Sequence, residues 1–162
     1  METKEKFEDW IKQQSDCKFI HSYQIIAYSP DEKLGFFIKQ AINDGRGSVK
    51  YIIAGAISDY GRLPRHNSTI YDAEISINYN TNHAILRENV VDPQHRGQGI
   101  GSLGLTYIKD FCESQNCAII TGFKHPVPNT QEEMDKLTRF YTKNEFEQCP
   151  NNKVQYRFCL AD

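Results

Sequence analysis

The order of the predicted elements indicates a mixed sheet of the α/β or α+β class. Two observations support this fold class: residues 19–91 hold five strand-like runs divided by short turns, and the rest of the chain alternates helix and strand. Successive short strands pair as antiparallel hairpins, whereas a strand–helix–strand unit pairs its strands in parallel. With 162 residues, 39% of them hydrophobic, the chain can bury a core without cross-links.

The first half of the chain begins with a predicted helix at about Glu5–Gln14, whose apolar residues recur at helical spacing. The strand-like runs that follow are Phe19–Ala27, Gly35–Ile42, Val49–Ile57, Thr69–Ile77 and His83–Val91. Asn43-Asp44-Gly45 is a typical hairpin turn, so the runs on either side of it should pair. Residues 59–68 contain Gly, Pro and Asn breakers and should form a loop.

The second half should start with a helix at about Ile100–Ser114, whose apolar residues suit packing on a sheet. Ala118–Thr121 reads as a short buried strand, and residues 122–130 as a loop with two prolines. Thr130 can cap a further helix, with Glu133 three residues on as in a capping box. The runs Glu145–Gln148 and Val154–Leu160 should close the chain as strands.

Composition excludes several classes of protein. The net charge is −2 with no long run of one sign, which argues against nucleic acid as the main partner. No apolar stretch is long enough to span a membrane, and the charged N-terminus leads into no secretory signal. The five cysteines form no C-x-x-C pair and the histidines are scattered, so we expect a reduced, cytoplasmic chain without a metal site.

The segment Arg96-Gly97-Gln98-Gly99-Ile100-Gly101 joins a predicted strand to a predicted helix. Three glycines at alternate positions let the backbone turn tightly and leave no side chains to block a ligand. The helix behind them begins with unsatisfied N–H groups and the positive end of its dipole. The segment is therefore expected to cradle an anion such as a pyrophosphate, with Arg96 adding a charge contact.

Three other interpretations of this segment are a P-loop, a dinucleotide-binding site and a purely structural turn. A P-loop requires Gly-Lys-Ser/Thr, but Ser102 and Leu103 follow Gly101. Residues 99–104 do match the dinucleotide pattern G-x-G-x-x-G, but no acidic residue stands at the end of the next strand, where an NAD site needs one. The chain that follows is also short for a doubly wound sheet. The glycines could also form only a tight strand-to-helix turn.

Two segments resemble one known family. Arg96-x-x-Gly99-x-Gly101, with Val91-Asp92-Pro93 before it and an amphipathic helix after it, is similar to the coenzyme A signature of the GNAT superfamily of N-acetyltransferases. Residues 140–146, Phe-Tyr-Thr-Lys-Asn-Glu-Phe, resemble that family's F-Y-x-K-x-G-F segment, in the family's order and at a similar spacing. The resemblance is strong over residues 83–148 and only topological before them.

This resemblance implies a fold and an activity. It implies one GNAT domain over residues 1–162, with a mostly antiparallel twisted sheet of six to seven strands, about four helices and a split at the central parallel strands. The implied enzyme is an acyltransferase that moves an acetyl group from acetyl-CoA directly to an amine of a small molecule or a peptide. A non-catalytic acyl-CoA-binding module is the alternative, an NAD-binding domain is a weaker one, and the chain could form a homodimer.

The resemblance also implies site residues. Backbone N–H groups near Asn89 and Val91 would bind the thioester carbonyl and the pantetheine arm. The implied cofactor-binding residues are Asn89, Val90, Val91, Arg96, Gly97, Gln98, Gly99, Ile100, Gly101 and Ser102. Tyr141 aligns with a tyrosine that family members often use as the acid for the departing thiolate.

The general base is less well defined. Glu88 is the first candidate, because strand alternation should send it to one face and its neighbours Arg87 and Asn89 to the other. Asp72 and Glu74 on the preceding strand are weaker candidates. Ile85 occupies the position where many family members carry an acid. Met134 occupies the position of an Asn that often contacts the cofactor in the family, and Asn129 matches that Asn only weakly. Asn144 replaces the usual glycine, and we expect it to adopt the left-handed conformation that Asn also accepts. Loop residues that could line the acceptor site are Tyr60, Arg62, Arg65, His66 and His125.

Overall fold

The structure is a computed structural model that describes residues 5, 8–9, 24–57, 69–124 and 130–159. Its strands are β1 (Gln24–Tyr28), β2 (Leu34–Asn43), β3 (Ser48–Ile57), β4 (Thr69–Asn78), β5 (His83–Val91), β6 (Ile119–Phe123), β7 (Glu147–Cys149) and β8 (Lys153–Arg157). Its helices are the 3₁₀ turn η1 (Pro93–His95) and the α-helices α2 (Ile100–Ser114) and α3 (Gln131–Lys143). Of the helix expected at 5–14, only residues 5, 8 and 9 are described, and they are helical.

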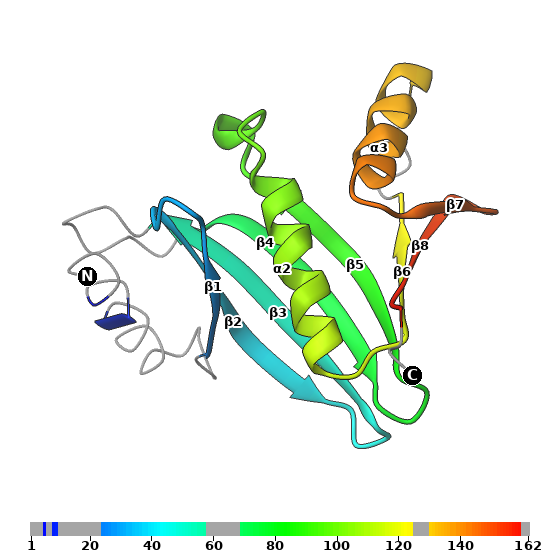
Figure 1. Ribbon diagram of the computed structural model, residues 1–162, viewed down its shortest axis with the longest axis horizontal. Coiled ribbons are helices and arrows are strands. Elements are labelled where there is room, and N and C mark those ends of the chain that lie inside the picture. The colour runs from blue at the N-terminus through cyan, green and yellow to red at the C-terminus, as the bar shows by residue number, and fades with distance from the viewer. Residues whose placement is uncertain (1–4, 6–7, 10–23, 58–68, 125–129, 160–162) are drawn as a thin grey trace.

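All eight strands form one sheet in the order β1-β2-β3-β4-β5-β6-β8-β7 (Figure 1). The neighbours from β1 to β5 pair antiparallel, and β5 and β6 are the parallel pair, joined through α2. The mixed, mostly antiparallel fold class is confirmed, with eight strands where six to seven were expected and two α-helices in the described residues where about four were. No described helix is long and apolar enough to cross a membrane.

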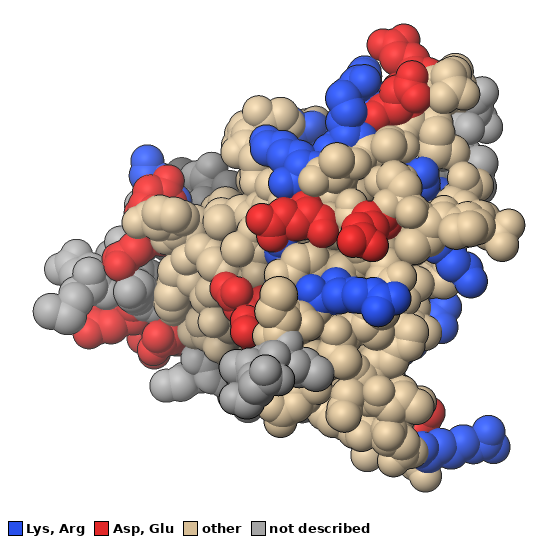
Figure 2. All heavy atoms as spheres, turned by 45° about the vertical axis from the view of Figure 1, so that its right-hand side comes forward, with Lys and Arg blue, Asp and Glu red and all other residues tan. Residues whose placement is uncertain are grey.

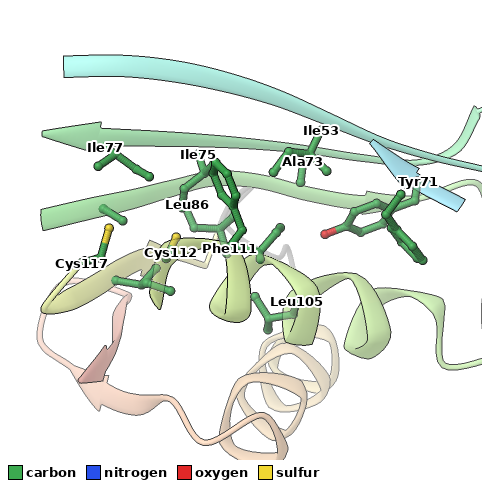
Figure 3. Close-up of a cluster of buried hydrophobic side chains, with 14 of the residues drawn as sticks. Ile53, Tyr71, Ala73, Ile75, Ile77, Leu86, Leu105, Phe111, Cys112 and Cys117 are labelled. Carbon is green, nitrogen blue, oxygen red and sulfur yellow. The ribbon is translucent and has the colours of Figure 1, made fainter. Parts of the chain in front are cut away.

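The core lies between β4 and α2. From Tyr71 onward the side chains of β4 alternate, so that Tyr71, Ala73, Ile75 and Ile77 are buried. Figure 3 shows these side chains reaching toward Leu105 and Phe111 on α2. A fully buried aliphatic side chain contributes about 1.5–3 kcal/mol. The opposite face of β4 carries polar side chains, and we call this face of the sheet, turned away from α2, the open face. On β2 and β3 the same face holds a second, buried cluster of Phe37, Ala54 and Ala56.

The central parallel pair separates partway along β5. Its register runs from His83 opposite Ile119 to Leu86 opposite Gly122, and β5 then continues to Val91 with no partner on that side among the described residues. A bulge accompanies the separation, because Leu86 pairs with Ile75 while Glu88 pairs with Glu74, which leaves one extra residue on β5. Figure 1 shows the two strands diverging toward the end where α2 begins and α3 lies. We call this opening the split.

Candidate functional site

The glycine segment forms an open backbone turn at the end of the split. Gly97 and Gly99 have φ angles of 81° and 78°, in the left-handed region that favours glycine. Gly99 is the N-cap of α2, and no side chain in the described part of the chain caps this helix end. A Cβ atom added at either glycine would meet nothing within 4 Å. Uncapped N–H groups, the helix dipole and free space together suit an anion.

Arg96 links this turn to the end of β5. Its Nε donates a hydrogen bond to the Val91 carbonyl at 3.2 Å, and the side chain is otherwise exposed. Just before it, His95 Nδ1 and Asp92 Oδ2 lie 2.8 Å apart across the 3₁₀ turn. The guanidinium is thus held beside the turn, where it can contact a phosphate group.

The third glycine of the G-x-G-x-x-G pattern has a packing role. A Cβ atom on Gly104 would lie 2.4 Å from Cζ of Tyr71, so α2 can approach β4 only with a glycine there. Gly101, by contrast, would place its Cβ 3.4 Å from Val91 and 3.5 Å from Phe140, which is ordinary contact. The dinucleotide-like spacing therefore arises from close helix–sheet packing.

The bulge changes which faces the β5 side chains occupy. Arg87 Nε lies 3.9 Å from Glu74 on the open face, and Glu88 pairs directly opposite Glu74, which places it on the same face. Asn89 instead accepts a hydrogen bond from Tyr71 Oη on the α2 face. The alternation predicted for these three residues is therefore wrong, because the extra residue in β5 shifts the period by one.

The open face next to the split carries three carboxylates. Glu74 is paired, with Lys50 Nζ at 3.7 Å and Arg87 at 3.9 Å, whereas Glu88 is exposed. Asp72, opposite Val90, is half-buried. Burial raises the pKa of the Asp72 carboxyl above its ordinary value, and the charge of Lys39 offsets part of that rise. Asp72 is therefore a stronger candidate base than its sequence position indicated.

Tyr141 lies on the other side of the split. It is 5% exposed, its ring contacts those of Phe140 and Phe146, and a Cβ atom on Gly122 would lie 3.8 Å from its Cε1. Burial raises the pKa of its phenol above the ordinary value. Among the described residues, no hydrogen-bond partner occupies its hydroxyl. The group is therefore a protonated donor beside the end of β6.

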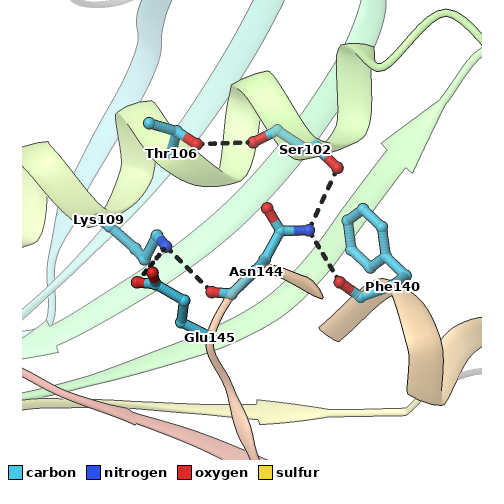
Figure 4. Close-up of polar contacts among 6 residues, drawn as sticks. All are labelled: Ser102, Thr106, Lys109, Phe140, Asn144 and Glu145. Atoms are coloured by element: carbon cyan, nitrogen blue, oxygen red, sulfur yellow. Dashed lines mark hydrogen bonds and ion pairs between the residues drawn. The ribbon is translucent and has the colours of Figure 1, made fainter. Parts of the chain in front are cut away.

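A polar network ties α3 to α2 (Figure 4). Asn144 Nδ2 donates to Ser102 Oγ at 3.2 Å and to the Phe140 carbonyl at 2.8 Å, and Lys109 Nζ donates to the Asn144 carbonyl at 3.0 Å. The expected left-handed conformation at Asn144 is wrong, since its φ is −91° and Glu145 has the positive φ of 70°. The network fixes Tyr141, near the end of α3, relative to the first turn of α2.

The sequence did not predict Tyr71 as a residue of this site, nor the hydrogen bonds by which Asn144 joins α3 to α2. Gly104 was the available signal for Tyr71, because a glycine inside a helical pattern often has a packing reason. Predicted site residues that lie outside the described part of the chain are Tyr60, Arg62, Arg65, His66, His125 and Asn129.

The open face is hollowed around β5. Two shallow pockets of about 290 Å³ each share His83 and Ile85, one reaching toward β6 and β8 and the other toward β3 and β4. His83 Nε2 lies 2.7 Å from Thr121 Oγ1 across the parallel pair.

Figure 2 shows basic and acidic side chains interspersed on the face it presents, without a broad area of one sign.

Comparison with known proteins gives a consistent result. The family model described as the acetyltransferase (GNAT) family matches residues 3–146. No curated protein sequence matches the chain. Among solved structures, a spermidine N-acetyltransferase from Vibrio cholerae, bound to CoA and spermine, is similar at 14% identity and a TM-score of 0.52 over 67% of this chain and 65% of its own.

Two further solved structures share this fold. A protein from Bacillus anthracis, described as a streptothricin acetyltransferase and bound to acetyl-coenzyme A, gives 18% identity and a TM-score of 0.51 over 68% of this chain and 64% of its own. A protein from Klebsiella pneumoniae, described as an acyl-CoA N-acyltransferase, gives 14% identity and a TM-score of 0.51 over 72% of this chain and 75% of its own. At these identities the likeness concerns the fold.

Proposed function

Because this chain belongs to the GNAT acetyltransferase family, whose members use acetyl-CoA, we propose that it is a single-domain N-acetyltransferase acting on an amine of a small molecule or a peptide. The observation that carries the proposal is the split: β5 and β6 separate beyond Leu86 and Gly122 at the end where the open N-terminus of α2 lies. A cofactor arm can enter between the two strands there while its phosphates meet the turn at residues 96–101.

The residues at this end fit the diphosphate part of coenzyme A. Gly97 and Gly99 leave the space a Cβ atom would fill, and N–H groups of the first turn of α2 face it without a side-chain cap. Arg96 would add a cation, and Gln98, Ile100, Gly101 and Ser102 complete the turn. Acetyl-CoA supplies an activated acyl carbon, and the N–H groups of Asn89 and Val91, on the β5 edge that has no described partner, would hold its arm in the split. The N–H group of Val90, between them, faces β4 and is not available to the cofactor.

Tyr141 would protonate the leaving thiolate. Its pKa is raised by burial, so the phenol carries its proton throughout the physiological range. Replacement by phenylalanine keeps the ring packed against Phe146 and removes only the proton donor.

Glu88 and Asp72 are the candidate bases for the amine, and both lie on the open face. Glu88 is exposed and free to reach a bound amine, whereas Asp72 has the raised pKa that makes a carboxylate a better proton acceptor. Comparing pH–rate profiles of Glu88→Gln and Asp72→Asn would separate them. The base is the residue whose amide variant loses the acidic limb of the kcat/KM profile.

The acceptor would approach from the open face, opposite to α2. The two hollows at His83 and Ile85 give that face a concave surface at the start of β5, and Arg87 lines one of them, whereas Glu88 and Asp72 lie further along the strands and line neither. We further propose that the enzyme works in the cytoplasm, without nucleic acid or membrane as a partner, and that it can form a homodimer.

A turnover assay with acetyl-CoA and a panel of amines, following release of free thiol, tests the activity. A non-catalytic acyl-CoA-binding module would be stabilised thermally by acetyl-CoA without turning over any amine. No stabilisation by any coenzyme A thioester would contradict both functions, and stabilisation by NAD alone would favour the dinucleotide interpretation.

A further inference from the structure

We propose that the side-chain amide of Asn89 is a hydrogen-bond donor to the acyl-pantetheine arm of bound acetyl-CoA, and that Tyr71 positions this amide. The inference rests on the proposed function, since it concerns the cofactor side of the same split. It assigns a task to two side chains, in addition to the backbone N–H groups of β5.

The bulge brings Asn89 to the cofactor side. Ala84 and Leu86 point toward α2 and are fully buried, so regular alternation would turn Glu88 toward α2 as well. The extra residue in β5 puts Asn89 there instead, opposite the buried Ala73, and sends Glu88 to the open face. An uncharged donor therefore occupies the side where negative charge develops on the thioester oxygen, and a carboxylate occupies the acceptor side.

Tyr71 fixes the orientation of the amide. Its hydroxyl donates to Asn89 Oδ1, and the tyrosine is 0% exposed. An amide held by its oxygen must turn its Nδ2 group away from that donor. Within the described part of the chain, Asn89 Nδ2 has no hydrogen-bond partner of its own. A half-buried NH₂ group beside an unpaired strand edge is thus left for a ligand.

The tyrosine itself has little freedom to move. Its ring lies against the backbone of α2 at Gly104, where even one added carbon would clash. On its other side, the Phe36 ring packs edge to face against it with centroids 5.6 Å apart. The hydroxyl, and with it the Asn89 amide, is therefore held by the packing of α2 on the sheet.

A purely structural role would be that Asn89 only satisfies the buried hydroxyl of Tyr71. The variant Asn89→Asp separates the two roles, because a carboxylate still accepts from Tyr71 but lacks the NH₂ donor. The matched control is Asn78→Asp at the far end of β4, where Oδ1 accepts from the backbone N–H groups of Asn80 and Thr81. Both substitutions preserve an acceptor and add the same charge.

The measurement is acetyl-CoA binding by titration calorimetry, with thermal melts to verify folding. We expect Asn89→Asp to weaken binding about tenfold or more, as for one lost hydrogen bond, and Asn78→Asp to leave it within about twofold. Wild-type affinity in a folded Asn89→Asp protein would overturn the inference. Absence of acetyl-CoA binding by the wild-type protein would instead contradict the proposed function.

A second set of variants keeps the inference testable if Asn89→Asp does not fold. Tyr71→Phe removes only the hydroxyl and should weaken acetyl-CoA binding about threefold, because the amide is no longer oriented. In an Asn89→Ala background the same change should have no further effect on affinity. An equal loss in both backgrounds would mean that Tyr71 acts on the fold alone and would overturn its positioning role.

Discussion

Gly104→Ala tests how closely α2 approaches the sheet. The new Cβ atom would lie 2.4 Å from Cζ of Tyr71 and 2.8 Å from both Cε atoms, and the ring is fully buried. Ordinary contact begins near 3.4 Å, so helix and ring must separate by close to 1 Å. Neither side can yield easily, because Phe36 packs against the ring and Leu105, next to the substituted residue, is itself 0% exposed.

The expected cost follows from two opposing effects. Overpacking of a well-packed core costs about 1–3 kcal/mol, and the separation needed here points to the upper end. Replacing a helix-interior glycine by alanine returns about 1 kcal/mol. The net result is a free energy of unfolding lowered by about 2 kcal/mol, which for a chain of this size lowers Tm by about 4–8 °C.

Urea and thermal unfolding measure this difference, and Gly101→Ala in the same helix is the control. There the added carbon meets Val91 and Phe140 at 3.4–3.5 Å, so we expect unchanged or slightly higher stability. If Gly104→Ala proves as stable as Gly101→Ala, the proposed close packing of α2 on Tyr71 is refuted.

Three further predictions follow from the site. Tyr141→Phe should lower kcat at least about 100-fold and leave acetyl-CoA affinity unchanged, and a smaller loss of kcat excludes Tyr141 as the acid. Because burial raises the pKa of Tyr141, the kcat of the wild-type enzyme should not fall through ionisation of this phenol until above pH 10. Glu145→Gly should raise the free energy of unfolding in urea by about 1 kcal/mol, since a left-handed φ of 70° strains a residue with a side chain; no gain would mean that lost contacts offset the strain. Folded Asp72 has a raised pKa, so its contribution to stability is present below its ordinary pKa and is lost as pH rises through the folded value. Asp72→Asn should therefore be more stable than wild type at neutral pH, with the difference shrinking in acid; a difference independent of pH would contradict this.

Local sequence signals predicted the elements that frame the site. The alternating glycines mark the turn before α2, and the helix has the bounds expected from its apolar spacing, Ile100–Ser114. Thr130 caps α3 as predicted, its side chain accepting from the Glu133 N–H at 3.2 Å. These features depend on residues a few positions apart, so a single sequence contains the information.

Features set by contacts between distant segments could not be predicted in this way. The bulge in β5 is defined by the pairing of Leu86 and Glu88 with adjacent residues of β4, and the polar run Arg87-Glu88-Asn89 interrupts the alternation of the strand without showing where the extra residue lies. The position of β8 between β6 and β7 likewise depends on pairing between segments that are distant in the sequence. The left-handed conformation expected at Asn144 occurs one residue later, because Glu145 stands opposite the glycine of the F-Y-x-K-x-G-F segment and has the positive φ of 70°.

The strand order also has a consequence for how the protein folds during synthesis. The strands β1 to β5 pair with their sequence neighbours, so this meander can form as soon as residue 91 has emerged. β6 then pairs with β5, but its other edge stays unpaired until β8, the last strand, has been made. During that interval the chain exposes a strand edge able to pair with another molecule. We therefore expect truncation before Lys153 to yield aggregation-prone chains rather than an enzyme of lower activity.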